Sequence, residues 1–506
     1  MTLSRRFILS PLTILFIVCI LLVGELASGT SLYFAFMAAL AVFFACITYN
    51  ILGGMSSISG IAYSRFALST LFISQFGKML LLERADSNLD VPQLTITVYA
   101  VYFGFLMLGT FVFSRVRLPL PRPVEPETPA QLKNLYAVAL TGGMLGTIAL
   151  MVLEFSQGNA NTSLAHGFAR ALSYLLPFSL VLAVDSRKRS THGQHSFGWM
   201  ALWPTLAMMF EGFIYASRSP FLEPFAIIFL TCFLRNFKFQ RRHLAAGFSI
   251  GAFFLLFVSP YFLYSRSLRG EATIREQAIA MIRLLEEAPA RWATIKTTVD
   301  EEALGTTGLV NYFETPGAAT LNRFALIGPD STLINACSTG FHYGFTSIKL
   351  DLLAEVPRFL FPNKPEIGSN KYLGHLDGQE SDSFETTNST ITPISDSFGA
   401  FSWAGVVVFP FLVWPALFVV YESIFDMRRP WGTVATALLL FGLTEGSMGN
   451  SVTESLIKSP AYVLILSWGA TWIIKMIPVV GDRTVLTRKM NAHPVSLGSQ
   501  PSESAP

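Results

Sequence analysis

Apolar runs long enough to cross a bilayer recur along the chain, and they constrain its fold more than any other feature. A transmembrane helix needs roughly 20 predominantly apolar residues. Segments that meet or approach this requirement are 7–23, 31–48, 66–82, 95–113, 135–154, 168–184, 199–216, 220–234, 244–264, 399–421, 431–446 and 458–477. They predict an all-α integral membrane protein with about twelve transmembrane helices. The predicted number of helices depends most on whether two segments cross the membrane. They are 220–234, which is short and contains Glu223 and Pro224, and 431–446.

The composition agrees with a membrane-embedded chain and argues against several other classes. Of the 506 residues, 52% are apolar and only 14% are charged, whereas roughly 25% are charged in an ordinary soluble protein. The formal net charge of +3 is too small to indicate nucleic-acid binding. The cysteines lack the spacing of a metal site, so we expect no disulfide, metal or cofactor; they are Cys19, Cys46, Cys232 and Cys337.

The positive charges between the predicted helices fall in alternate loops. One set of loops holds Arg5, Arg6, Arg65, Arg115, Arg117, Arg122, Lys133, Arg187, Lys188, Arg189, Arg235, Lys238, Arg241, Arg242, Arg428, Arg429, Arg483, Arg488 and Lys489. The short loops of the other set, such as 24–30 and 155–167, are nearly free of lysine and arginine. Because cytoplasmic loops carry the excess of these residues, both termini are predicted to be cytoplasmic. The run 7–23 is followed by no convincing cleavage site, so we expect it to remain as the first helix.

These patterns divide the chain into six segments. They are N-terminal transmembrane helices (1–114), a cytoplasmic proline-rich linker (115–134), central transmembrane helices (135–264), a large periplasmic loop (265–398), C-terminal transmembrane helices (399–480) and a disordered cytoplasmic tail (481–506). Within the linker, LPLPRPVEPETP at 118–129 predicts an extended backbone.

The loop 265–398 is the one long hydrophilic stretch, and loops of this length are usually functional or disordered. Its aromatic residues argue for a folded loop: Trp292, Tyr312, Phe313, Phe341, Tyr343, Phe359, Phe361 and Tyr372. Its first part, 272–288, places apolar and charged residues on opposite faces of a helix. This amphipathic helix either lies along the membrane interface, roofs a cavity or simply packs on the bundle.

Charged residues also occur at the outer ends of the predicted helices, where they are costly. Arg218 lies in a turn between the seventh and eighth helices, with Glu211 before it and Glu223 after it. Glu154 and Glu445 fall near the outer ends of their own helices. One interpretation is a polar cavity open to the periplasm, and the other is an interhelical ion pair of Arg218 with a neighbouring glutamate. Further basic residues come from the loop: Arg266, Arg269, Arg323, Arg358 and Lys364. Arginine is suited to bidentate recognition of phosphate.

Three segments resemble the bacterial oligosaccharide repeat-unit polymerases, the O-antigen polymerase (Wzy-type) family. VPRFLFPNKP at 356–365 is similar to a segment of that family's large periplasmic loop. TITPISDSFGAFSWAGVV at 390–407, with Asp396 at the acidic position, is similar to the segment that enters the next helix. YASRSPFLEPF at 215–225 is similar to the turn that carries an arginine, although Ser217 stands where many relatives have glycine. The order of helices, large loop and closing helices also matches.

The resemblance implies a GT-C-like polymerase or ligase architecture in the bacterial inner membrane. Its activity would join undecaprenyl-diphosphate-linked oligosaccharide units on the periplasmic face, with release of undecaprenyl diphosphate and no metal. Partners would be the lipid-linked oligosaccharide, the bilayer, a chain-length regulator and a flippase. We hypothesise diphosphate ligands at Arg218, Arg266, Arg269 and Arg358. Candidates for the general base are His342, Asp330, Asp396 and Glu211, with His342 slightly favoured because histidine titrates near neutrality.

Two other functions fit the same sequence. An O-antigen ligase shares the architecture and differs in its acceptor, the lipid A core. A secondary transporter or lipid-linked oligosaccharide flippase also often has about twelve helices, but transporters tend to show internal repeats and helices broken at the midplane. Here the charges gather at the outer ends of the helices.

Overall fold

The computed structural model describes most of the helical regions and part of the large loop. The described residues are 8–124, 126, 128–157, 164–191, 195, 198–215, 218–234, 241–254, 258, 261–262, 276, 279–280, 282–283, 286–287, 312–314, 325–356, 372–373, 376, 391–442 and 447–476. Some side chains within these ranges, including those of Glu154 and Arg218, are not described.

Every regular element in these ranges is a helix, and no strand occurs among them. The α-helices are α1 (Pro11–Ala27), α2 (Leu32–Ile51), α3 (Ile58–Ala67), α4 (Ile73–Leu80), α5 (Pro92–Phe113), α6 (Pro129–Gln157), α7 (Leu164–Ser173), α8 (Leu175–Ser190), α9 (Trp199–Ile214), α10 (Arg218–Leu234), α11 (Arg241–Phe253), α15 (Ile327–Ser338), α16 (Thr346–Glu355), α18 (Pro393–Ile424), α19 (Pro430–Gly442), α20 (Met448–Asn450) and α21 (Ser459–Met476). Short π-helical segments join α3 to α4 (Leu68–Phe72) and precede α21 (Ser451–Lys458). The all-α prediction is confirmed, and each predicted apolar run overlaps a helix.

Several of these helices are long and apolar enough to cross a bilayer. They are 32–56, 92–113, 130–153, 165–190 and 393–424, and the shorter apolar helices 11–27 and 221–234 accompany them. Local sequence explains where the helices start: Ser10 caps α1 by accepting from the Thr13 amide at 3.1 Å, with Pro11 at the first position. The chain is therefore a multi-pass, membrane-embedded protein.

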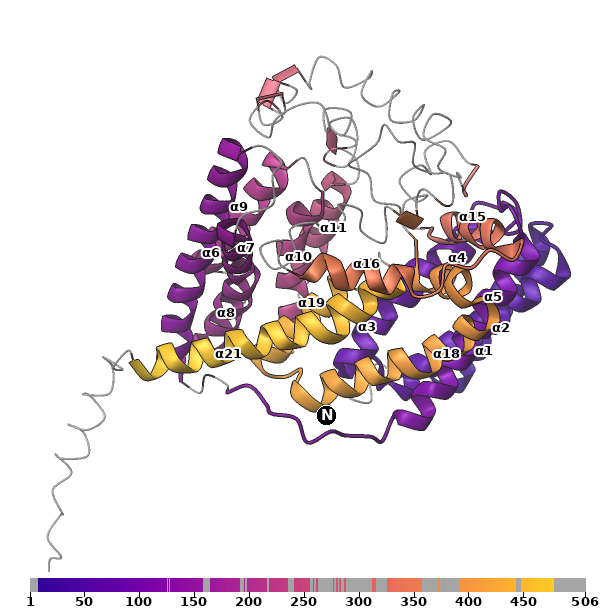
Figure 1. Cartoon of the computed structure of the whole chain (residues 1–506), viewed down its shortest axis with the longest axis horizontal. Coiled ribbons are helices and arrows are strands. Elements are labelled where there is room, and N and C mark those ends of the chain that lie inside the picture. The colour runs from indigo at the N-terminus through magenta and orange to yellow at the C-terminus, as the bar shows by residue number, and fades with distance from the viewer. Residues whose placement is uncertain are drawn as a thin grey trace, which may run out of the picture.

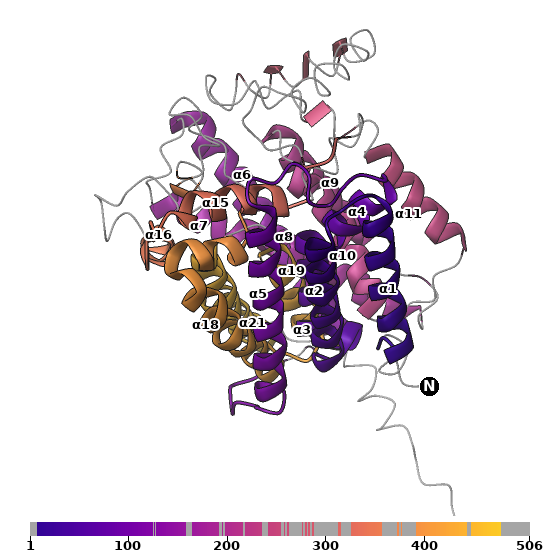
Figure 2. The same cartoon turned by 90° about the vertical axis from the view of Figure 1, so that its right-hand side faces the viewer.

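Helix α18 packs against helices that are far from it in the sequence. It lies along α5, which in turn packs on α2, so a C-terminal helix completes the N-terminal bundle (Figures 1 and 2). Helices α6 to α10 form a second group, with α19 and α21 against it (Figure 1). Gly109 allows the close approach of α5 to α18, because a Cβ there would lie 2.4 Å from the Phe411 carbonyl oxygen. Nearby, the Trp414 indole donates to the Tyr102 hydroxyl at 2.6 Å.

The two ends of α18 have different neighbours. At its C-terminal end, Ser423 accepts from the Leu118 amide at 3.0 Å, which ties the proline-rich linker to the helix. At its N-terminal end, Asp396 accepts from Tyr343 of the large loop at 2.6 Å. The linker and the described loop elements thus lie at opposite ends of the bundle, as Figure 1 shows for the linker and α15. This separation agrees with the predicted alternation of basic and non-basic loops.

A short segment of the large loop, with Tyr312 and Glu314, is tied to the turn after α4. The Tyr312 hydroxyl donates to the Ala85 carbonyl at 2.9 Å, and the Glu314 amide donates to Glu83 Oε2 at 3.0 Å. Lys78 is buried next to this contact. Its Nζ lies 3.0 Å from Glu83 Oε2 and 4.8 Å from the centre of the Tyr312 ring. The loop is therefore held over the N-terminal bundle by a buried cation.

The predicted amphipathic helix 272–288 is described only in part. Its described residues, 276, 279–280, 282–283 and 286–287, are helical. Ile279 and Ile282 are exposed, as are Glu286 and Glu287.

The opposite placement of linker and loop predicts opposite labelling of two cysteines. In a chain whose native cysteines are replaced by alanine, Thr339→Cys should react with a membrane-impermeant maleimide added outside intact spheroplasts. Arg117→Cys should react only after the membrane is permeabilised, because it follows α5 at the linker end. Equal labelling of both positions in intact spheroplasts would contradict the predicted orientation.

Candidate functional site

Helix α18 is broken near its N-terminal end. Phe401 (φ −137°, ψ 18°) and Ser402 (φ 53°, ψ −141°) leave the helical conformation and divide it into 393–400 and 403–424. A non-glycine residue at such a positive φ costs on the order of 1–3 kcal/mol, and residues of this kind concentrate at functional sites.

Amide groups of the large loop donate hydrogen bonds to the carbonyl groups that lose their helical partners at the break. The Tyr343 amide donates to the Gly399 carbonyl at 3.3 Å, and the Gly344 amide donates to the Ala400 carbonyl at 3.0 Å. Gly344 has φ +59° and so provides the left-handed turn that aims both amides at the helix end. The segment 342–344, which we call the capping loop, thus replaces the next turn of the helix.

His342 of the capping loop joins the same hydrogen-bond arrangement. Its Nδ1 lies 3.2 Å from the Gly399 carbonyl oxygen. A carbonyl oxygen only accepts, so Nδ1 carries the hydrogen in this contact, and Nε2 of the neutral ring keeps its lone pair. The side chain is exposed and stands edge-on to Phe398, with 6.3 Å between the ring centres. His342 can therefore accept a proton from a molecule that approaches the break.

Asp396 lies in the first turn of α18 and is fully buried. One carboxylate oxygen accepts from the Tyr343 hydroxyl at 2.6 Å, and the other accepts from the Met448 amide. A Cβ at Gly399 would lie 2.6 Å from the Tyr343 hydroxyl, so only glycine leaves room for this contact. Asp396 thus joins α18, the capping loop and α20, and both of its oxygens are occupied.

Asp330, on α15, is also fully buried and is more fully hydrogen-bonded. Its carboxylate accepts from the hydroxyls of Tyr99, Thr392 and Ser395, each at 2.5 Å, and from the Thr392 amide at 3.0 Å. Burial raises the pKa of the Asp330 carboxyl, while these hydrogen bonds act in the opposite direction. Two carboxylate oxygens offer about four lone-pair sites, so none is left for a substrate. Asp330 thus joins α5, α15 and α18.

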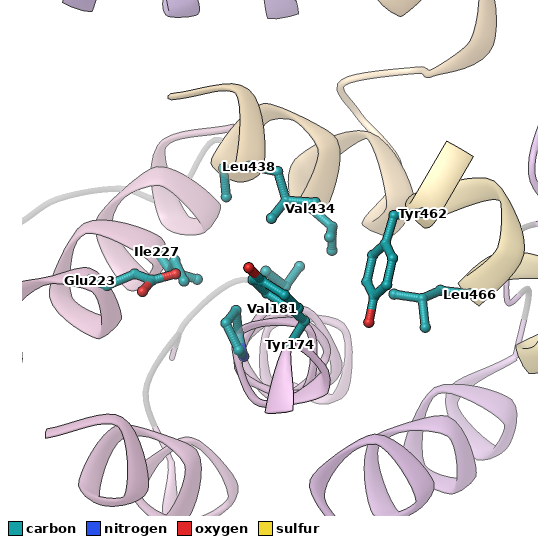
Figure 3. A pocket seen from close by; sticks show the side chains of 10 residues that line it. Tyr174, Val181, Glu223, Ile227, Val434, Leu438, Tyr462 and Leu466 are labelled. Atoms are coloured by element: carbon teal, nitrogen blue, oxygen red, sulfur yellow. The ribbon is translucent and has the colours of Figure 1, made fainter. Parts of the chain in front are cut away.

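Glu211 belongs to the other bundle. It lies on α9, close enough to Glu223 of α10 for their charges to interact. Glu223 lines a small cavity between α8, α10, α19 and α21 that Tyr174 and Tyr462 also line (Figure 3). The cavity has about 10 Å³ of room, which suits a single water molecule. Glu211 therefore lies in a different bundle from the break in α18.

The predicted diphosphate ligands fall largely beyond the described part of the chain. Arg218 is the first residue of α10, and its side chain is not described. Arg266, Arg269 and Arg358 lie outside the described residues. Within the described ranges, no group of three or more His, Cys, Asp or Glu side chains is arranged to hold a metal ion.

Sequence reasoning missed several residues that organise this region. Lys78 was detectable as the charged residue inside the apolar run 66–82. Tyr99 and Tyr343 gave no signal of their own, because an aromatic residue in an apolar run or a loop is ordinary. Their roles depend on which carboxylates the fold brings beside them.

The hydrogen bonds to Asp330 predict a specific loss of stability. Tyr99→Phe removes one bond to a buried carboxylate, which contributes about 1.5–3 kcal/mol. A lower melting temperature of the purified protein is expected. Tyr33→Phe is the matched control, since its exposed hydroxyl contacts Thr97 at 2.8 Å and its loss should change little. If the two variants melt at the same temperature, Asp330 does not stabilise the fold in this way.

Comparison with known proteins finds no relative of this chain: no family model, no curated protein and no solved structure matches it.

Proposed function

We propose that the chain is a membrane-embedded glycosyltransferase that polymerises undecaprenyl-diphosphate-linked oligosaccharide units on the periplasmic face of the bacterial inner membrane. One observation carries the proposal. At the loop end of α18, the break holds His342 with its Nδ1 on the Gly399 carbonyl and its Nε2 available as a base. The resemblance of 215–225, 356–365 and 390–407 to the repeat-unit polymerases supports the same activity.

The proposal includes about twelve membrane crossings with both termini in the cytoplasm. Helices α1 to α11 would supply nine crossings, because α3 and α4 form one and α7 and α8 form another. Helices α18, α19 and α21 would supply the last three. The large loop would then lie on the periplasmic side, next to the break in α18.

The reaction can be written for these residues. A hydroxyl oxygen of the acceptor sugar attacks the anomeric carbon of the donor glycan, and the bond from that carbon to the diphosphate oxygen breaks. His342 Nε2 takes the hydroxyl proton, and undecaprenyl diphosphate leaves with the electron pair. Negative charge builds on the diphosphate, which arginine side chains would stabilise. Arg218, Arg266, Arg269 and Arg358 are the proposed ligands.

A transporter or flippase is the alternative that the broken helix itself raises, since carriers use discontinuous helices. In carriers the break lies near the bilayer midplane. The second part of α18, 403–424, spans about 33 Å at 1.5 Å per residue, which is enough by itself to cross a hydrocarbon core about 30 Å thick. The break therefore lies toward the loop end, which favours chemistry at the membrane surface. A ligase would use the same site and a lipid A core acceptor.

The role of His342 predicts the effect of one substitution. His342→Gln keeps a side chain that can bond the Gly399 carbonyl but removes the base, so polymer formation should fall about 100-fold or more. The measurement is polymer ladder formation by purified protein given lipid-linked oligosaccharide, with lipid A core as a second acceptor to detect a ligase. His195→Gln, at an exposed histidine beyond α8, is the matched control and should retain full activity. Full activity of His342→Gln at normal abundance would remove His342 as the base.

The proposed diphosphate site predicts the effect of a second substitution. Arg218→Ala should lower the polymerisation rate by about 100-fold or more, since removal of one donor to a developing oxyanion costs roughly 2.7–4 kcal/mol. Arg218→Lys should restore part of the rate, because it keeps the charge but not the bidentate geometry. Normal glycan chain length in cells with normal amounts of Arg218→Ala protein would rule out this role.

A further inference from the structure

Glu25 is a buried glutamate in the last turn of α1, in the N-terminal bundle. Its side chain is fully buried, and neither carboxyl oxygen has a hydrogen-bond partner among the described residues. Burying a carboxylate without partners is very costly, whereas burying the neutral acid costs much less. This environment therefore favours a carboxyl group that carries a proton.

The charged groups near Glu25 do not favour its ionised form. Among the described helices, α1 packs mainly on α2, which has no charged residue, and on α4, whose one charged residue is Lys78. Lys78 Nζ lies 3.0 Å from Glu83 Oε2 and 2.9 Å from Ser87 Oγ, so its charge is already paired. Asp86, in the turn after α4, is close enough for its negative charge to oppose a second one on Glu25.

The other ionisable groups of this region give Glu25 no positive partner. Arg84 is paired with Asp86, with 3.1 Å between Nε and Oδ1. Glu314 and Tyr312 come from the large loop, and Glu314 Oε1 lies 4.0 Å from the already paired Lys78. The negative charges of the region therefore add to the cost of ionising Glu25.

A chain of hydrogen bonds links the end of α1 to the segment 312–314, which we call the loop tether. The Thr30 amide donates to the Glu25 carbonyl at 3.0 Å, and the Thr30 hydroxyl oxygen accepts from the Ala85 amide at 2.9 Å. The Ala85 carbonyl in turn accepts from the Tyr312 hydroxyl at 2.9 Å. Tyr312 is fully buried and close enough to Glu25 for a charge on the carboxyl group to act on it. The buried carboxyl group and the loop tether therefore share one small region.

We propose that Glu25 is a proton-binding site whose occupation keeps the loop tether closed on the N-terminal bundle. With the proton bound, the carboxyl group is neutral and remains buried beside Tyr312. Loss of the proton leaves an uncompensated negative charge near Asp86, and opening of the tether lets water reach it. The closed state binds the proton more tightly than the open state, so the closed state is favoured at low pH and is lost progressively as the pH rises.

Hydrogen exchange at the loop tether tests this site. The Glu314 amide donates to Glu83 Oε2, so its exchange reports opening of the tether. The full chain in lipid nanodiscs is compared from about pH 6 to about pH 9.5, above the ordinary range of carboxyl groups and below that of tyrosine and lysine. After correction for the intrinsic exchange rate, exchange in peptides that cover 312–314 should rise with pH. The rise should not exceed about tenfold per pH unit, which is the limit for release of one proton.

Neutral side chains at position 25 separate this site from the other titratable groups. Glu25→Gln and Glu25→Met should both fold and should protect the tether equally across the pH range, because nothing remains to ionise there. Glu286→Gln, at an exposed glutamate of the large loop, is the matched control and should keep the pH dependence of the wild type. The histidines and cysteines of the chain are the same in all these proteins, so the difference between them reports Glu25.

Three results would overturn the proton site. The first is a pH dependence in Glu25→Gln and Glu25→Met equal to that of the wild type. The second is loss of tether protection in both variants at every pH, since the fold would then require the carboxylate. The third is recovery of wild-type protection at about pH 9.5 with sodium chloride but not with choline chloride, and no such recovery in Glu25→Gln. That result would assign the carboxyl group to a metal cation.

Discussion

A helix that breaks within a membrane-spanning segment must find partners for the carbonyl groups it frees, and burial of Gly399 and Ala400 keeps water from bonding them. In this protein the capping loop meets that requirement at α18. The Tyr343 and Gly344 amides and the His342 ring all donate to the carbonyls of Gly399 and Ala400. The position of the large loop, the exposure of His342 and the start of the second half of α18 all depend on this cap.

Buried carboxylates then fix the cap to the rest of the protein. Asp396 ties the capping loop to the start of α18, and Asp330 ties α15 to both α5 and α18. Both were predicted as candidates for the general base. In the structure both carboxylates are buried and hydrogen-bonded within the fold, whereas His342 is exposed. The proposed reaction therefore uses His342 as the base.

The two bundles carry different features. The N-terminal bundle, completed by α18, carries the break and the capping loop. The second bundle carries Glu211 and Glu223, and Glu223 lines a cavity of water size. Arg218 begins α10 in this second bundle. The proposed reaction, which uses both His342 and Arg218, would bring the donor diphosphate and the acceptor sugar together from different bundles.

The sequence alone determined the class of the protein and where its helices lie. Apolar runs of about bilayer length predict helices because every backbone group in lipid must be bonded within its own segment. That argument is local, so it located α5 and α18 well and anticipated a folded large loop. The tertiary structure alone decided that α18 joins the N-terminal bundle, that it breaks at Ser402, and that Asp330 and Asp396 are buried and hydrogen-bonded. These features depend on contacts between residues far apart in the chain, such as Tyr99 with Asp330 and Gly109 with Phe411. Neither spacing nor hydropathy records such contacts, which is why the sequence could list His342, Asp330 and Asp396 as candidates but only the fold could separate them.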